Sequence, residues 1–220
     1  MSQFLSLRQV LVERQSISIL LVWLFHLSAM IGISIGFENW FMSKTPINLS
    51  LIFMLLLWSF SSHLSKFSIG IGVFFIGGMF IEWLGVHYGF LFGTYEYGSN
   101  LGPKILEVPW FIGINWALLT LITGVMATSI TKRKTTSIIV GASLMVFLDI
   151  FLEFSAPIFD FWRFENGIAP LKNYIAWFGI AILFHFIFQS LKLKGDTKLA
   201  YHLYAAQLIF FIYFYGFYSL

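Results

Sequence analysis

The chain has 220 residues, of which 59% are hydrophobic, 20% are aromatic and only 10% are charged. Soluble domains carry about 25% charged residues, so this composition excludes an ordinary soluble enzyme and predicts an integral membrane protein. Cysteine is absent, which excludes disulfides, thiolate metal sites and cysteine nucleophiles. The basic residues behind the net charge of +3 are scattered through predicted loops, so the charge does not indicate a nucleic-acid partner.

Apolar segments follow one another along the chain, and each of them is long enough to be considered as a transmembrane helix. Spanning a bilayer needs about 20 mostly apolar residues. Seven segments are predicted to span, the second being the shortest: 16–36, 46–62, 68–89, 108–130, 136–156, 172–191 and 198–219. No long polar stretch interrupts them. We therefore expect an all-α bundle of about seven transmembrane helices that forms a single domain over residues 1–220.

The basic residues predict the orientation of this bundle. Seven spans place nine of them on the side of the N-terminus, namely Arg8, Arg14, Lys66, Lys132, Arg133, Lys134, Lys192, Lys194 and Lys198. Four lie on the opposite side, namely Lys44, Lys104, Arg163 and Lys172. Because cytoplasmic loops are enriched in lysine and arginine, we expect a multi-pass protein of the cell (inner) membrane with a cytoplasmic N-terminus.

Two acidic residues lie inside a predicted span. Asp149 and Glu153 are four residues apart, so both carboxyls occupy one face of the helix, one above the other. A charged side chain in hydrocarbon costs about 2.5–3.5 kcal/mol or more to insert, so an intramembrane acid is a functional-site hypothesis. At about 1.5 Å per residue, Glu82 and Asn115 lie at nearly the same depth as Asp149, roughly 10 Å from the outer ends of their spans. Four polar groups from three spans are therefore expected to converge on one layer.

The residues around this layer suggest a chemistry. Burial favours the neutral form of a carboxyl, and a neutral acid beside an apolar substrate is suited to protonating a carbon–carbon double bond. Aromatic rings can stabilise a passing carbocation through their π-faces. They are dense here: Trp83, Tyr88, Phe92, Tyr95, Tyr97, Trp110, Trp116, Trp162, Tyr174 and Trp177. His87 is the one histidine predicted near the layer, where it could tune the acids.

Structural interpretations of the same residues remain open. The aromatic rings could form an interfacial belt. Glu82 could pair with His87 or Lys104, and Asn115 could join two helices. Gly85, Gly89 and Gly93 repeat every four residues, which favours close packing between helices. The Asp149–Glu153 spacing is also compatible with magnesium diphosphate binding, although that chemistry usually needs a second acidic motif.

Two stretches carry a family resemblance. The first comprises Glu82-Trp-Leu-Gly-Val-His-Tyr-Gly-Phe-Leu-Phe-Gly-Thr-Tyr-Glu-Tyr97, Leu101-Gly-Pro-Lys104, Val108-Pro109 and Asn115-Trp116. The second comprises Asp149-Ile-Phe-Leu-Glu153, Ala156, Trp162, Gly167-Ile-Ala-Pro170, Asn173-Tyr174 and Trp177. In this order and spacing they resemble the CruF-type carotenoid 1,2-hydratases, a membrane family that includes bisanhydrobacterioruberin hydratases. The resemblance covers about residues 78–185. It departs from the family pattern after Glu153, where Phe154 replaces a proline.

The resemblance implies hydration of the terminal 1,2 double bond of an acyclic carotenoid end group, which gives a tertiary alcohol. The expected substrate is lycopene, γ-carotene or a related polyene, with water as co-substrate and neither cofactor nor metal. Membrane lipid and other carotenoid enzymes are the expected partners. The expected catalytic residues are Asp149, Glu153, Glu82 and Asn115, with Asp149 as proton donor. The expected substrate-binding residues are Trp83, His87, Tyr95, Tyr97, Trp110, Trp116, Trp162, Asn173 and Trp177.

Two other functions fit the same residues. A membrane carotenoid cyclase of the lycopene type begins with the same protonation, but an internal alkene captures the cation in place of water. A non-catalytic carotenoid- or lipid-binding membrane protein would leave the pigment unaltered.

Overall fold

A computed structural model describes residues 2–59 and 64–219, apart from the side chains of residues 2–8, 11 and 64. The described helices are α1 (Ser2–Ser34), α2 (Glu38–Met42), α3 (Thr45–Ser59), α4 (Leu64–Tyr88), α5 (Trp110–Ile130), α6 (Lys134–Ser155), α7 (Leu171–Ser190) and α8 (Thr197–Ser219). The described strands are β1 (Tyr95–Tyr97), β2 (Lys104–Ile105), β3 (Val108–Pro109) and β4 (Trp162–Phe164).

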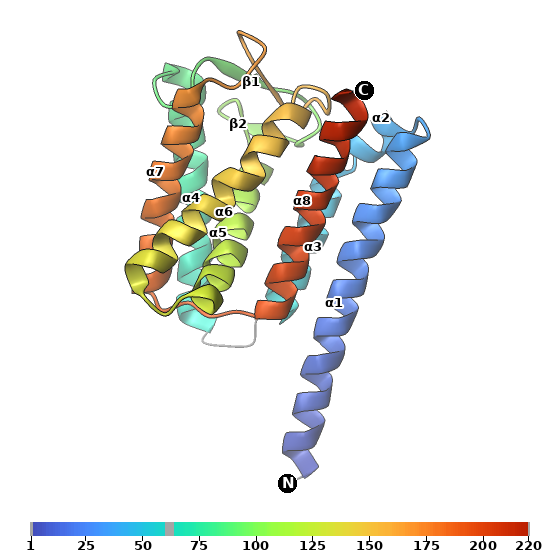
Figure 1. The fold of residues 1–220 in the computed structure, drawn as a ribbon, viewed down its shortest axis with the longest axis vertical. Helices are drawn as coiled ribbons and strands as arrows, with labels where there is room; N and C mark the ends of the chain where they lie inside the picture. Colours follow the sequence, from blue (N-terminus) through green and yellow to red (C-terminus); the bar gives the residue numbers. More distant parts are fainter. Residues whose placement is uncertain (1, 60–63, 220) are drawn as a thin grey trace.

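The long helices run up and down beside one another, with the two termini at opposite ends of the bundle (Figure 1). Six helices of the described residues are long and apolar enough to cross a membrane. The second predicted span corresponds to α3, which has only 15 residues, and residues 60–62 of that prediction lie outside the described part. The prediction of an all-α membrane bundle is confirmed. The upper and lower ends of the bundle are named as they appear in Figure 1.

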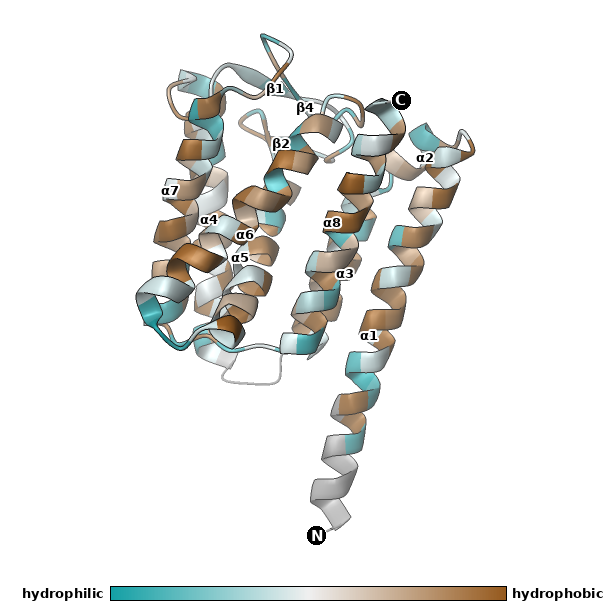
Figure 2. Cartoon of the chain, in the orientation of Figure 1, coloured by the Kyte–Doolittle hydropathy of each residue, from teal (hydrophilic) through white to brown (hydrophobic). Residues whose placement is uncertain are grey.

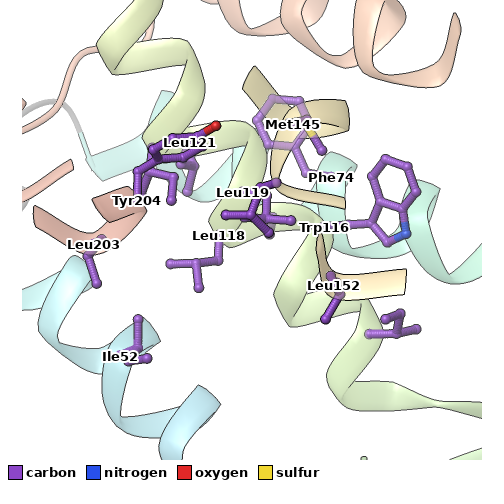
Figure 3. Close-up of a cluster of buried hydrophobic side chains, with 14 of the residues drawn as sticks. Ile52, Phe74, Trp116, Leu118, Leu119, Leu121, Met145, Leu152, Leu203 and Tyr204 are labelled. Atoms are coloured by element: carbon purple, nitrogen blue, oxygen red, sulfur yellow. The ribbon is translucent and has the colours of Figure 1, made fainter. Parts of the chain in front are cut away.

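Helix α5 forms the centre of the bundle because it is apolar around its whole circumference. It packs against α3, α4, α6, α7 and α8, and its buried side chains run almost without interruption from Phe111 to Ala127. Close approach to α4 requires Gly78, where an added Cβ would lie 2.7 Å from the Cβ of Trp116. Leu118, Leu119 and Leu121 of α5 lie at the heart of the cluster of buried side chains in Figure 3.

The lower end of the bundle carries the N-terminus and the short connection between α5 and α6. Figure 2 shows hydrophilic residues gathered at this connection and along the one from α7 to α8. The α5–α6 connection includes Lys132 and Arg133. The alternation of spans on which the orientation was predicted is therefore present, while the side of the membrane on which the N-terminus lies stays a prediction.

The upper end carries two small ribbons that the sequence did not predict. Strands β1 and β4 pair antiparallel, with Tyr95 opposite Phe164 and Tyr97 opposite Trp162. In both strands the central residue is exposed and the two outer residues are buried. Because alternate residues of a strand face opposite sides, the ribbon turns four aromatic side chains toward the bundle.

The loop beside this ribbon is tied down by Asp160. Its carboxylate accepts hydrogen bonds from the backbone N–H and the hydroxyl of Ser99, at 2.8 and 2.6 Å. These bonds lower the pKa of the Asp160 carboxyl below its usual value. An added Cβ at Gly98 would lie 2.2 Å from the Asp160 carbonyl oxygen, so this contact requires glycine.

Candidate active site

Glu82 of α4 is buried at the upper end of the bundle and is surrounded by hydrogen-bond donors. The hydroxyls of Tyr95 and Tyr97 donate to its Oε2 at 2.6 and 2.7 Å. The indole N–H of Trp116 donates to its Oε1 at 2.8 Å. Burial and the nearby Glu82 carboxyl raise the pKa of both tyrosine hydroxyls well above its usual value. The two tyrosines therefore stay protonated and remain available as donors.

The approach of the β1 ribbon to α4 depends on Gly85. An added Cβ there would lie 2.5 Å from the ring of Phe92 and 2.7 Å from the hydroxyl oxygen of Tyr95. Gly89 and Gly93 lie beyond the end of α4, with φ of +62° and +109°, a backbone region that glycine adopts readily. The predicted packing of these three glycines between helices is wrong. They serve the turn that brings the ribbon back onto Glu82.

Glu153 of α6 has a donor set of its own. The indole N–H of Trp162 donates to its Oε2 and the side-chain amide of Asn173 to its Oε1, both at 2.8 Å. Trp162 reaches it because α6 ends at Ser155 and the chain turns back into β4. Phe154, at the position of the family's proline, still lies within the helix.

Asp149 differs from the other two acids. It is 1% exposed, and no protein group among the described residues lies within hydrogen-bond distance of either carboxyl oxygen. Glu153 and Glu82 are close enough to interact with it electrostatically. Two of the three clustered acids thus have donors, and the third has none.

A small cavity lies between the two acids that accept hydrogen bonds from the protein, Glu82 and Glu153. Glu82 and Glu153 both line it, together with aromatic rings and one amide: Phe92, Tyr95, Tyr97, Trp162, Phe164, Trp177 and Asn173. Trp177 stacks on Trp116, with ring centroids 3.9 Å apart and planes 18° from parallel. The carboxyls are therefore enclosed by π-faces and N–H or O–H donors.

A much larger cavity lies next to this one. It has a volume of about 590 Å³ and is lined by α1, α2, α3, α5, α6, α8 and the loop before β4. Asn115 lies in its wall and not in that of the small cavity. Ile112 and Trp162 line both cavities. The predicted layer is therefore divided: Glu82 and Glu153 line the small cavity, Asn115 lines the large one, and Asp149 lines neither.

Four predicted substrate-binding residues line neither cavity: Trp83, His87, Trp110 and Trp116, the last of which donates to Glu82. Trp83 is half-buried and contacts His87, with ring centroids 5.2 Å apart. His87 is exposed and lies 3.9 Å from the carboxylate of Glu107. Trp110 is 37% exposed. The alternative pairing of Glu82 with His87 or Lys104 is wrong, because Lys104 donates to the carbonyl oxygen of Tyr97.

Comparison with known proteins identifies a family for most of the chain. The family model described as carotenoid biosynthesis protein matches residues 43–220. The chain belongs to the carotenoid biosynthesis protein family. No curated protein and no solved structure matches it. The match extends well beyond residues 78–185, to which the resemblance was assigned, and includes α3 and α8.

Membership of the carotenoid biosynthesis protein family gives the chain a role in making carotenoids in a membrane. It does not specify the reaction. The contribution of α1 and α3 to the large cavity was missed by the sequence reasoning. Asn48, a polar residue in the apolar second span, was a signal that could have indicated it, because its amide lies in the wall of that cavity.

Proposed function

We propose that this member of the carotenoid biosynthesis protein family adds water across the terminal 1,2 double bond of an acyclic carotenoid end group. The observation that carries the proposal is a buried acid without protein donors, Asp149, beside two acids that have them. The product would be a tertiary alcohol. Water is the co-substrate, and no cofactor or metal has a part in the proposal.

The donor sets divide the roles among the acids. An indole N–H can only donate, so the oxygens of Glu82 and Glu153 that face Trp116 and Trp162 must accept. Hydrogen bonds of this kind favour the ionised form of a carboxyl. Asp149 lacks them, and a buried charge without partners costs far more than a buried neutral acid. Asp149 is therefore the proposed proton donor, as the sequence also favoured.

The proposed reaction proceeds in two steps. The Asp149 carboxyl delivers its proton to C2 of the end group, and the electron pair of the double bond forms the new C–H bond. The tertiary cation left at C1 would be stabilised by aromatic π-faces, for which Trp162 and Trp177 are candidates because both line the cavity that holds Glu82 and Glu153. Water adds to C1, and the proton it gives up passes to the Asp149 carboxylate, directly or by way of Glu153, so the acid is restored and one water is consumed.

Asn115 is a candidate for holding that water. Ile112 and Asn115 are three residues apart on α5, so they lie on the same face of the helix, and both line the large cavity. The Asn115 amide can donate to one water and accept from another. The proposed orientation places this site in the outer half of the cell membrane, where water has a short route to it.

The test is expression in a bacterium that supplies lycopene, followed by mass analysis of the extracted pigment. We expect a mass gain of one water, with the oxygen taken from isotopically labelled solvent. Asp149→Asn should abolish this product at unchanged protein abundance in the membrane. Glu96→Gln is the control, because Glu96 lies on the exposed face of β1.

Other outcomes would contradict the proposal. Wild-type product levels in Asp149→Asn would remove Asp149 from the mechanism. A cyclised pigment of unchanged mass would replace hydration by cyclisation. Pigment that copurifies with the chain and is never altered would identify a carrier.

A further inference from the structure

The large cavity has the properties of a binding site for an apolar chain. Its volume of about 590 Å³ lies within the range of about 300–1,000 Å³ typical of small-molecule sites. Apolar and aromatic side chains make up most of its wall, among them Phe25, Ile52, Leu148, Phe161 and Phe210. No aspartate or glutamate of the described residues lines it. Lys44 is the one lysine or arginine of the described residues in its wall, so an anionic group would find a single cationic partner there, whereas a hydrocarbon chain would find apolar contacts over most of the wall.

The small cavity cannot serve this purpose. Its wall is formed by the side chains that hold Glu82 and Glu153 in place, and its volume is only about 10 Å³, against about 590 Å³ for the large cavity. A substrate with a long hydrocarbon chain must therefore lie elsewhere and present only its end to the acids. The large cavity is adjacent and shares Ile112 and Trp162 with the small one.

Helix α6 connects the two compartments. Leu148 and Leu152 line the large cavity, and they flank Asp149 along the helix at one and three residues' distance. Glu153, one turn after Asp149, lines the small cavity. The same two turns of helix thus carry both apolar wall and acid.

Trp162 has two functions at this boundary. Its ring forms part of the wall of the large cavity, while its indole N–H donates to Glu153 at 2.8 Å. It belongs to β4, a short strand at the upper end that pairs only with β1. A shift of this ribbon would change the boundary and would break the hydrogen bond between Trp162 and Glu153.

We propose that the large cavity binds one acyclic end of a carotenoid polyene, and that Ile112 and Trp162 form the partition across which the end group meets the carboxyls. This inference rests on the proposed function and deepens it, because it assigns a place to the substrate. It also assigns a role to α1, which lies outside the residues matched by the family and yet contributes Phe25, His26, Ser28 and Ala29 to the wall.

The test measures pigment binding by the purified full-length chain in detergent micelles, with lycopene as the probe. Ala29→Phe places a ring in the cavity, because Ala29 lines it. Ala205→Phe is the matched control: Ala205 is also half-buried in a long helix, but does not line the cavity. Lycopene retained per protein after gel filtration is expected to fall about tenfold in Ala29→Phe and to stay at the wild-type level in Ala205→Phe.

A second variant covers the case in which Ala29→Phe does not fold. Ser28 also lines the cavity and is exposed, so Ser28→Phe disturbs the helix packing less and is expected to reduce retention in the same direction. Folding is judged by monodisperse elution of the protein itself.

The outcomes separate the two proposals. Wild-type retention of lycopene in the folded Ala29→Phe and Ser28→Phe variants overturns the inference, even if the wild-type protein hydrates the pigment. Selective loss of retention in these variants supports the inference, even if the pigment is never hydrated, in which case the proposed reaction alone fails. Equal loss in Ala205→Phe also overturns it, because the effect would not depend on the cavity.

Discussion

Replacement of Glu82 tests whether its three donors depend on it. Glu82→Leu removes the acceptor of all three hydrogen bonds. The Tyr95 hydroxyl keeps a weaker alternative, the backbone carbonyl of residue 82 at 3.5 Å. The Tyr97 hydroxyl and the Trp116 indole N–H have no second acceptor among their hydrogen bonds within the described residues. A buried donor left unpaired costs about 1–3 kcal/mol, so the two together should lower the free energy of unfolding by roughly 2–6 kcal/mol.

Glu82→Gln is the matched comparison because it keeps an acceptor and removes the charge. Its amide oxygen can accept from Trp116, while its NH2 group donates to the tyrosine oxygens, since a hydroxyl both donates and accepts. We expect a loss of only about 1 kcal/mol in this variant.

Thermal unfolding of the purified protein in micelles, followed by loss of the monodisperse elution peak, measures the difference. For a chain of this size 1 kcal/mol shifts the midpoint by about 2–4 °C, so Glu82→Leu should unfold at least about 4 °C below the wild-type protein. If Glu82→Leu proved as stable as Glu82→Gln, the three donors would not depend on this carboxyl and the described cluster would be wrong.

Two further predictions concern the upper end of the bundle. Gly85→Ala should destabilise the protein by about 1–3 kcal/mol, because the added Cβ would meet Phe92 and Tyr95. Gly72→Ala in the same helix is the control: its Cβ would have nothing within 4 Å, so it should stabilise the protein by up to about 1 kcal/mol. The thermal midpoints of both variants measure this, and a Gly85→Ala variant as stable as the wild-type protein would contradict the close approach of the ribbon to α4. The lowered pKa of Asp160 means that its stabilisation of the loop is complete above the unfolded value near 4 and is lost as the pH falls through the lower folded value. The Ser99 amide, which donates to Asp160, should therefore lose protection against hydrogen exchange in that acidic range, measured against the intrinsic exchange rate at each pH, and unchanged protection there would refute the contact.

The helices and the depth of the acids followed from composition and spacing. Hydrocarbon accepts few polar groups, so the spans are distinct in the sequence, and a constant rise per residue puts Glu82 and Asp149 at a common depth. Both acids lie in one buried cluster. Depth in the membrane does not determine on which side of a helix a side chain lies. Asn115 has the predicted depth and yet lines the neighbouring cavity.

The loops were the part that sequence reasoning could not resolve. The aromatic residues of 89–109 and 156–170 looked alike, because hydropathy does not distinguish a ring that packs inward from one at the membrane surface. The pairing of β1 with β4 determines which of these rings pack inward. Because it joins segments about 65 residues apart, local sequence patterns do not reveal it. It directs Tyr95 and Tyr97 inward and leaves Trp110, at the start of α5, partly exposed.

The order of the residues in the chain has a consequence for biogenesis. Every donor to Glu82 follows it, at 13, 15 and 34 residues' separation, and both donors to Glu153 follow it at 9 and 20. Synthesis proceeds from the N-terminus, so each acid is made before its donors, and its hydrogen bonds form only once a later segment has folded back onto it. The donor set around Glu82 is therefore complete only after α5, which carries Trp116, has joined α4.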